Sequence, residues 1–463
     1  MNTNASPTAI EQLAANAIDT RFEDLDPTFI ETTKLRIIDT LGCAIGGYPD
    51  TGNPEMIQLY KDQGGKPEAT ILVDGTRVPV INAGFVNSIL ARSFDFEPVS
   101  PIVDGVNTPG HVSGTTVPTA LAVAEATGAS GHDMMTALIV GDDIAARILA
   151  ASGFGFSLGW DGVGTVNCFG ATAIAGRLMG LDKHQLNHAF GLVLNMLGTT
   201  FQSIWDATMS FKLAQGLAAQ AGILSAQLAK TGWTGAVDAL HSQFGYYNMF
   251  TAGCKEPHFL TDKLGEAYYA DAVTKPYPGC RIPHAAEDCI LKIMNEHGIT
   301  ADTIANVNLD LAQGGIDHKC GQTFELGEYP HGTAAFSYHY VVACSCLRGS
   351  VKPEHYTEKA IRDPEIAKFI EKITLTSVDD VPFEGARVTI TTTDGNSYKE
   401  RVDVAKGNPI FNPISNEELL AKFWTNVEFS GKIGREKATK ALSLLEKLEK
   451  LDDVRKLVPF LVA

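Results

Sequence analysis

Histidines beside charged residues, in loops rich in glycine and proline, are the first candidate catalytic groups in this sequence. His284 lies in the loop KPYPGCRIPHAAED, where Pro283 and His284 are expected to begin a helix. The positive end of a helix favours an anion. Lys275 and Arg281 in the same loop add cationic charge, and an arginine can hold a carboxylate through two hydrogen bonds. The loop therefore predicts a site for a small anion, unless Lys275 and Arg281 are solvated loop charges.

A second candidate lies in the stretch ARSFDFEPVSPIVDGVNTPGHVSG. A helix is expected to end near Ser93, Asp95 follows it, and His111 comes just before the next helix. A carboxylate next to an imidazole orients the ring and raises its pKa, which gives a general base useful near neutral pH. In the structural alternative, Asp95 caps a helix and His111 bonds to loop carbonyls. Arg92, in the same stretch, is a candidate for binding the substrate.

Two further candidates are polar groups in apolar helices. Tyr340, in FSYHYVVA, could donate a proton if its phenol points into a pocket, although core packing is commoner for such a residue. Lys212, in SFKLAQG, either extends to the surface or lines a polar pocket. A metal-dependent hydrolase is a rival hypothesis, with irregularly spaced candidate ligands His318, Cys320, His331 and His339.

Composition and missing motifs exclude several classes of protein. The sequence contains no GxxxxGK[ST], no GxGxxG after a strand, no HExxH and no GxSxG, so nucleotide, zincin and serine-hydrolase sites lose support. A formal net charge of −17 argues against nucleic acid or an anionic membrane as partner, since either needs a broad cationic face. An anionic substrate would therefore require a local cluster of cations.

Cysteine usage and the first residues predict a soluble, cytoplasmic protein. The eight cysteines form no CxxC pair and lie in apolar surroundings, which is typical of reduced, buried thiols. The first residues show no basic segment followed by an apolar block, and no run approaches the roughly 18 uncharged apolar residues of a membrane span.

The predicted fold class is mainly α with an α+β insertion. Residues 1–265 read as helices rich in alanine and glycine, which pack closely against one another. Residues 266–409 mix β-rich segments with helices and form a predicted α+β lid domain. Residues 410–463 return to helix, so we predict one large helical domain made from both chain ends.

Local signals predict several individual elements. These are a helix with Pro27 in its first turn, hairpins at Asp74–Gly75 and Asp394–Gly395, helices over His284–His297 and Ala334–Leu347, and a capping box of Ser415 with Glu418.

The order of these motifs resembles the MmgE/PrpD family, which includes 2-methylcitrate dehydratase, cis-aconitate decarboxylase and an iminodisuccinate epimerase. The resemblance runs from DTLGCAIGG to GNPIFNPIS, and its most specific stretches are SFDFEPV…TPGHVSG, FGATAIAGRLMGLD, KPYPGCRIPHAA, FSYHYVVA and DGNSYKERV. It implies a homodimer with its site in a cleft between two domains and no metal or organic cofactor. It also implies that the site residues are Asp95, His111, His284 and Tyr340, with Lys275 and Arg281 in the same loop.

Three departures from the family pattern concern substrate binding. Asp161 stands where the family often has a His-Pro pair, and Lys212 is displaced by one position in a K-x-L-H run whose histidine is Ala214 here. The family's DFDD is DFEP, with Glu97 and Pro98. We therefore expect Asp161 and Lys212 to form part of an altered substrate-binding wall.

The resemblance implies a cofactor-independent lyase that abstracts a proton next to a carboxylate of a small di- or tricarboxylate. The first expectation is a 2-methylcitrate dehydratase-like hydro-lyase, with His111 oriented by Asp95 as base and His284 or Tyr340 as acid. Lys275 and Arg281 would stabilise the developing enediolate. The alternatives are a decarboxylase, an epimerase or isomerase, and an inactive scaffold of the same fold.

Overall fold

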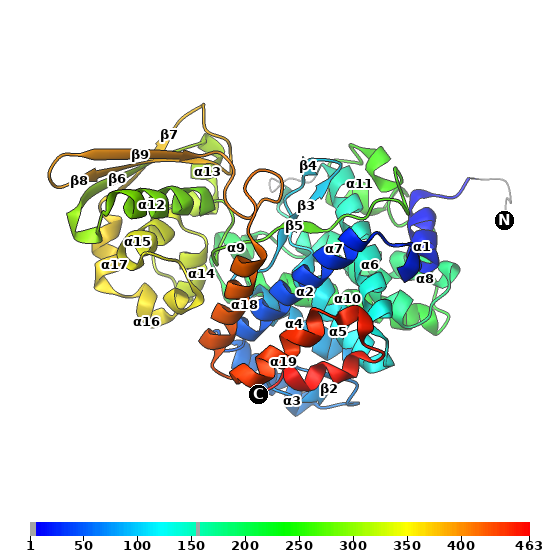
Figure 1. Cartoon of the computed structure of the whole chain (residues 1–463). Coiled ribbons are helices and arrows are strands. Elements are labelled where there is room, and N and C mark those ends of the chain that lie inside the picture. The colour runs from blue at the N-terminus through cyan, green and yellow to red at the C-terminus, as the bar shows by residue number, and fades with distance from the viewer. Residues whose placement is uncertain (1–5, 154–157) are drawn as a thin grey trace.

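The computed structural model describes residues 6–153 and 158–463, which form a larger helical lobe and a smaller lobe that contains a sheet (Figure 1). The larger lobe takes helices from both parts of the chain. They are α1 (Ala9–Asp19), α2 (Pro27–Gly47), α3 (Asn53–Gln63), α4 (Val80–Arg92), α5 (Ser113–Thr127), α6 (Gly131–Ser152), α7 (Val163–Leu178), α8 (Lys183–Val193), α9 (Gln202–Trp205), α10 (Leu213–Lys230), α11 (Tyr246–Phe250), α18 (Asn416–Ser430) and α19 (Arg435–Leu445).

Small residues allow the helices of this lobe to pack closely, as their composition predicted. α2 begins at Pro27, and the Asp26 side chain accepts a hydrogen bond from the Thr28 N–H at 2.7 Å. At its other end, a Cβ on Gly47 would lie 2.0 Å from the carbonyl oxygen of Leu90 in α4, so only glycine fits. Among the described residues, no helix is both long and apolar enough to cross a bilayer.

The smaller lobe places helices on a four-stranded sheet. Its strands are β6 (Ile304–Leu311), β7 (Ile373–Ser377), β8 (Ala386–Thr392) and β9 (Ser397–Val402), and its helices are α12 (His284–His297), α13 (Gln313–Asp317), α14 (Pro330–Ala335), α15 (Tyr338–Arg348), α16 (Glu358–Ile361) and α17 (Pro364–Ile370). The strand order is β7-β6-β8-β9, with β6 and β7 parallel and the other pairs antiparallel. Figure 1 shows α12 and α15 together beside one face of the sheet.

Short strands complete the structure. β1 (Ala69–Thr70) and β2 (Arg77–Val78) pair around the Asp74–Gly75 turn, as the sequence predicted. β3 (Val99–Val103) pairs with β4 (Val106–Asn107) and with β5 (Asp271–Val273). β3 is absent from the elements predicted from the sequence, and its pairing with β5 joins segments that are far apart along the chain.

Each lobe has its own hydrophobic core, and the segment around Asp95 contributes two aromatic side chains to the core of the smaller lobe. The core of the larger lobe runs from Ile10 in α1 to Leu461 and includes Phe423 of α18. The core of the smaller lobe also contains Phe94 and Phe96, which belong to the chain that leaves α4. Two aromatic side chains therefore fix the backbone on either side of Asp95 against the smaller lobe.

The predicted fold class, mainly α with an α+β part, is confirmed. The hairpin at Asp394–Gly395, the helix over His284–His297 and the capping box before α18 are also confirmed. The helix predicted over residues 334–347 is wrong in its start, because α14 ends at Ala335 and Ser337 caps a separate helix, α15. The proposed domain boundaries at residues 265 and 409 stay a prediction.

Candidate active site

A pocket of about 100 Å³ lies where the two lobes meet, and most of the predicted site residues lie in or beside it. Loops next to α4, α5 and α7 place polar groups there from the larger lobe. The smaller lobe contributes the loop before α12, the turn after α13 and the loop before β8. The charged and imidazole groups on its wall are Arg92, Asp95, His111, Asp161, Arg281, His318 and Glu384.

Asp95 adopts a backbone conformation that is unusual for a residue with a side chain. Its φ angle is +46°, and its N–H donates to the Arg92 carbonyl at 2.9 Å in the turn that ends α4. Left-handed conformations cost free energy in residues other than glycine and cluster at functional sites. The flanking Phe94 and Phe96, packed in the core of the smaller lobe, hold this conformation in place.

Arg92 is the centre of a buried charge network. Its Nη1 lies 2.7 Å from Asp95 Oδ1, 2.9 Å from Glu97 Oε1 and 2.7 Å from His111 Nδ1. Lys275 approaches from the other side, with Nζ 2.6 Å from both the carboxylate and the backbone carbonyl of Asp95. All of these groups except the His111 ring are almost completely buried. The two carboxylates thus share two cations, which removes the cost of leaving a buried charge unpaired.

The His111 ring is the most exposed part of this network on the pocket wall, since 23% of its side chain is exposed. Its Nδ1 lies 3.1 Å from Glu97 Oε1. Two side-chain amides hold its backbone, because Asn167 and Gln215 both donate to the His111 carbonyl, at 2.7 and 3.0 Å. Burial and the positive charge of Arg92 lower the pKa of His111. The ring is therefore neutral at neutral pH.

Asp161 lies on the wall of the pocket at the start of α7. Its Oδ1 accepts a hydrogen bond from the Val163 N–H at 3.0 Å. Burial raises the pKa of this carboxyl, and the nearby charge of Arg92 only partly opposes the effect. Asp161 therefore binds a proton more readily than an exposed carboxyl and can donate a hydrogen bond from that state.

Arg281 lines the pocket, whereas His284 lies behind it. The Arg281 guanidinium donates to the carbonyls of Ala405 and Lys406 at 2.6 and 2.5 Å, and no carboxylate among the described residues forms a salt bridge with it. The His284 ring is fully buried and approaches Arg281 only at 3.3 Å. Burial and the charges of Arg281 and Lys275 hold the pKa of His284 well below its usual range. His284 is thus a neutral imidazole next to cations.

Besides Lys275 and His284, which lie behind the pocket wall, the predicted site residues Tyr340 and Lys212 also lie outside the pocket. The Tyr340 hydroxyl donates to the backbone carbonyl of His355, so it does not point toward His111. Lys212 belongs to another buried cluster, in which its Nζ lies 2.7 Å from Asp50 Oδ2. Tyr329 donates to the same oxygen at 2.8 Å. Both side chains point away from the pocket because their polar groups bind buried partners elsewhere: the Tyr340 hydroxyl binds the His355 carbonyl, and the Lys212 ammonium binds Asp50.

The trio Asp95, Glu97 and His111 has the donor types of a metal site, and its ligand atoms lie within 4.8 Å of one another. The Nη1 atom of Arg92, however, contacts all three groups at 2.9 Å or less. A guanidinium therefore occupies the position that a cation would take. Of the four ligands of the rival metal hypothesis, His331 is bound to Asp50 at 2.7 Å, and among the described residues His318 and Cys320 lie together in a group of possible ligands that includes neither His331 nor His339.

Glu97 and Gln215 are site residues that the sequence analysis did not select. Glu97 was noted only as a departure from a family pattern, yet it contacts both Arg92 and His111. Its position two residues after Asp95, in an irregular segment, could have indicated that the two carboxylates lie in the same site. Gln215 lies in α10 and gave no signal of its own, because a polar residue in an apolar helix has many structural explanations.

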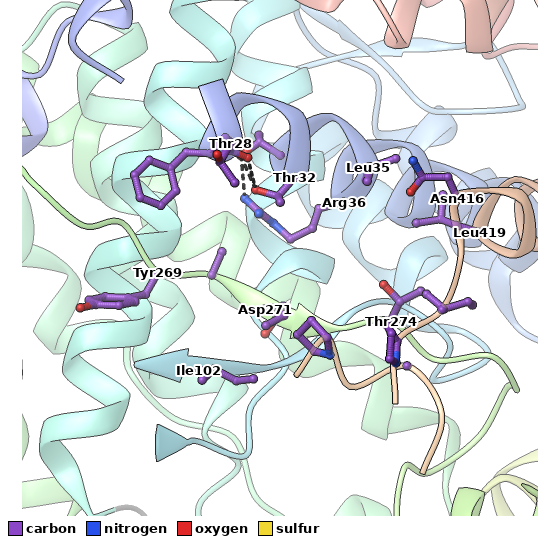
Figure 2. Close-up of a pocket in the computed structure, with 18 of the residues that line it drawn as sticks. Thr28, Thr32, Leu35, Arg36, Ile102, Tyr269, Asp271, Thr274, Asn416 and Leu419 are labelled. Carbon is purple, nitrogen blue, oxygen red and sulfur yellow. Dashed lines mark hydrogen bonds between the residues drawn. The ribbon is translucent and has the colours of Figure 1, made fainter. Parts of the chain in front are cut away.

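A larger pocket, of about 350 Å³, lies between α2, the β3–β5 pair and the segment before α18 (Figure 2). Arg36 and Asp271 are its charged groups. Asp271 Oδ2 accepts hydrogen bonds from the backbone N–H groups of Val112 and Ser113, at 2.8 and 2.6 Å, so it anchors the start of α5 behind His111. Burial raises the pKa of Asp271 to about 8. Its lining includes no histidine, so we place the candidate chemistry in the smaller pocket.

Comparison with known families accounts for both lobes. The model of the MmgE/PrpD N-terminal domain matches residues 11–257, and that of the MmgE/PrpD C-terminal domain matches residues 277–449. The chain belongs to the MmgE/PrpD family. The MmgE/PrpD family includes lyases that act on carboxylates.

The chain is also similar to the cis-aconitate decarboxylase of Mus musculus. It is 24% identical over 443 residues, which cover 92% of this chain and 87% of that protein. The MmgE/PrpD resemblance predicted from the motifs is thus confirmed over both lobes.

Proposed function

We propose that this chain is a lyase that removes a proton from the carbon next to a carboxylate of a small di- or tricarboxylate, with His111 as the general base. The observation that carries the proposal is the position of the His111 ring. It is neutral, reaches the pocket and is held from behind by Arg92 and Glu97, while two side-chain amides hold the backbone carbonyl of His111. A base needs both a free lone pair and a fixed direction.

The base role requires one tautomer of His111. The Nη1 of Arg92 carries two hydrogens but has three acceptors close to it. We assign both hydrogens to the carboxylates of Asp95 and Glu97, since charge-assisted hydrogen bonds are the stronger ones. In that tautomer the Nδ1–H of His111 donates to Glu97 and the lone pair of Nε2 is the base, so the 2.7 Å contact between Nδ1 and Nη1 of Arg92 carries no hydrogen bond and has to lengthen. Assignment of the ring nitrogens by ¹⁵N NMR tests this step directly.

Arg281 and Asp161 are the proposed binding groups for the substrate. Arg281 keeps its positive charge without a salt bridge among the described residues, so it can stabilise the charge of a substrate carboxylate as an enediolate develops. Asp161, with its raised pKa, can donate a hydrogen bond where an ionised carboxylate would repel the substrate. Lys275 binds Asp95 on the side away from the pocket, so it affects the substrate only through Asp95.

In the proposed dehydration, His111 takes the carbon proton and the electron pair forms the double bond as the hydroxyl leaves with a proton. Asp161 is the carboxyl on the pocket wall whose raised pKa suits it to supply that proton. The catalytic role predicted for His284 stays a prediction, because its buried ring lies behind Arg281. We rank a 2-methylcitrate dehydratase-like hydro-lyase first.

Decarboxylation is the second candidate, and the mouse cis-aconitate decarboxylase is the observation that favours it. In that reaction the bond to the carboxyl group that leaves as CO₂ supplies the electron pair, and the carbon takes its proton from Asp161, the carboxyl on the pocket wall whose pKa is raised. Return of a proton to the opposite face of the same carbon would instead give an epimerase.

Proton NMR in deuterated water separates these reactions. The purified chain is incubated with a panel of hydroxy- and unsaturated di- and tricarboxylates. New vinyl signals from a hydroxy acid would indicate dehydration, replacement of an unsaturated acid's vinyl signal by those of an alkene with one carboxylate fewer would indicate decarboxylation, and deuterium incorporation without net conversion would indicate epimerisation. If no compound on a broad panel exchanges or converts, the proposal fails and the inactive scaffold is favoured.

A further inference from the structure

Two thiols and an imidazole meet on the wall of the candidate pocket. The Sγ atoms of Cys280 and Cys320 and one ring nitrogen of His318 all lie within 4.8 Å of one another. Cys280 and His318 line the pocket, whereas Cys320 is completely buried behind them. All three side chains come from the smaller lobe, from the loop before α12 and the turn after α13.

The spacing of these atoms suits a tetrahedral metal ion. With bonds of about 2.3 Å to sulfur and about 2.0 Å to nitrogen, tetrahedral zinc separates its ligand atoms by about 3.5 to 3.8 Å. A small inward movement of the side chains is enough to reach these separations. Two thiols and one imidazole are also ligand types that zinc prefers over hard cations.

The backbone that carries these ligands is anchored on both sides. The Cys280 N–H donates to the Ala335 carbonyl at 2.8 Å, and the preceding Gly279 carbonyl accepts from Lys275 at 2.9 Å. On the other side, the Gly321 N–H donates to the His318 carbonyl at 3.0 Å. A Cβ at Gly321 would lie 2.2 Å from the Ile316 carbonyl oxygen, so this tight turn requires glycine. The ligands are thus held close together before any ion arrives.

We propose that Cys280, His318 and Cys320 form a binding site for a thiophilic divalent cation such as Zn²⁺. Two thiolates balance the charge of the ion, and a fourth position stays open toward the pocket. Three protein ligands with one open position leave room for water or another small ligand. The pocket itself is the entry path, because Cys280 and His318 lie on its wall. This site shares the pocket wall with the Arg92 network but takes no ligand from it, and it does not depend on the reaction proposed above.

Cobalt binding tests the proposal with a readout other than activity. The metal-free full-length protein, kept reduced with a phosphine so that Cys280 and Cys320 stay free thiols, is titrated with Co²⁺. We expect one equivalent to bind, with a thiolate-to-cobalt charge-transfer band in the near ultraviolet and the intense visible bands of tetrahedral cobalt. Zn²⁺ should abolish both by displacement.

Single substitutions locate the site. Cys280→Ser and His318→Ala should each weaken Co²⁺ binding by at least about ten-fold, because each removes a ligand. Cys254→Ser, which changes a partly exposed cysteine of the larger lobe, should bind as the wild type does. Circular dichroism confirms that each variant is folded, and Cys280 is the decisive position because it is partly exposed whereas Cys320 is fully buried. Absence of the charge-transfer band in the wild type, or an unchanged band in Cys280→Ser, would overturn the proposal.

Discussion

The Nδ1 atom of His111 lies 3.1 Å from Oε1 of Glu97, and the same carboxylate oxygen lies 2.9 Å from Nη1 of Arg92. One oxygen therefore contacts both the proposed base and the cation beside it. The second oxygen of Glu97 is buried without a hydrogen-bond partner among the described residues. Of the two carboxylates beside the His111 ring, Glu97 is thus the nearer, since Asp95 Oδ1 lies 3.6 Å from Nδ1.

The substitution Glu97→Gln tests whether Glu97 orients the His111 ring. Glutamine keeps the size of the side chain but removes the negative charge that raises the pKa of His111. We expect kcat/KM to fall by at least about ten-fold, because the ring loses its orienting carboxylate. The acid limb of the pH profile should also move to lower pH. Glu371→Gln, an exposed site, is the control. An unchanged profile would show that Glu97 does not act through His111.

The substitution His111→Ala should abolish most of the activity. General base catalysis contributes about 10² to 10⁴-fold, so we expect kcat to fall within that range while the melting temperature changes little. In the wild type, kcat/KM should fall only below about pH 6.5, the ordinary pKa of histidine, since burial and Arg92 lower the pKa of His111. His241→Ala changes an exposed histidine and should keep full activity. A His111→Ala enzyme as fast as the wild type would refute the base role.

The substitution Tyr340→Phe should leave activity within about two-fold of the wild type. The hydroxyl donates to the His355 carbonyl, so its removal costs the hydrogen bond and about 1 kcal/mol of unfolding free energy. Steady-state kinetics and urea denaturation measure the two effects. A hundred-fold loss of kcat with unchanged stability would restore Tyr340 to the catalytic groups.

The substitution Asp271→Asn should stabilise the protein increasingly as the pH rises from about 4 to 8. Burial raises the pKa of Asp271 to about 8, whereas it is about 3.9 in the unfolded chain. Between these values the folded state binds the extra proton, so wild-type stability falls as pH rises, by at most about 1.4 kcal/mol per unit. Asparagine stays neutral and can still accept from Val112 and Ser113.

Urea denaturation at pH 5 and pH 8 measures this difference. The gain of Asp271→Asn over the wild type should be larger at pH 8. Asp379→Asn, at an exposed carboxyl, controls for the change in net charge. An equal gain at both values would show that Asp271 is ionised in the folded protein throughout this range.

Elements with a local signal were predictable from the sequence. Asp26 and Pro27 fix the start of α2, Ser415 and Glu418 cap α18, and the turn at Asp394–Gly395 joins β8 to β9. Each signal acts within a few residues, so no knowledge of the rest of the fold is required. The same holds for His111 and Asp95, whose place between two helices suggested a site.

Contacts between distant residues were not predictable in this way. The partner of Lys212 is Asp50, which is 162 positions away in the sequence. The direction of the Tyr340 hydroxyl depends on how α15 packs in its lobe, and a helical pattern does not specify the partner of one phenol. Glu97 joined the site only once its segment folded back over His111.

The cluster around Asp50 constrains how the pocket can admit a substrate. Asp50 and Lys212 belong to the larger lobe, whereas Tyr329 and His331 come from the smaller lobe and contact the same carboxylate at 2.8 and 2.7 Å. A hinge motion that separated the lobes would break the contacts of Asp50 with Tyr329 and His331. It would also expose the buried ion pair of Asp50 and Lys212 to water. The Asp50 cluster therefore opposes separation of the two lobes. A substrate should enter the pocket through movements that keep the lobes in contact at Asp50.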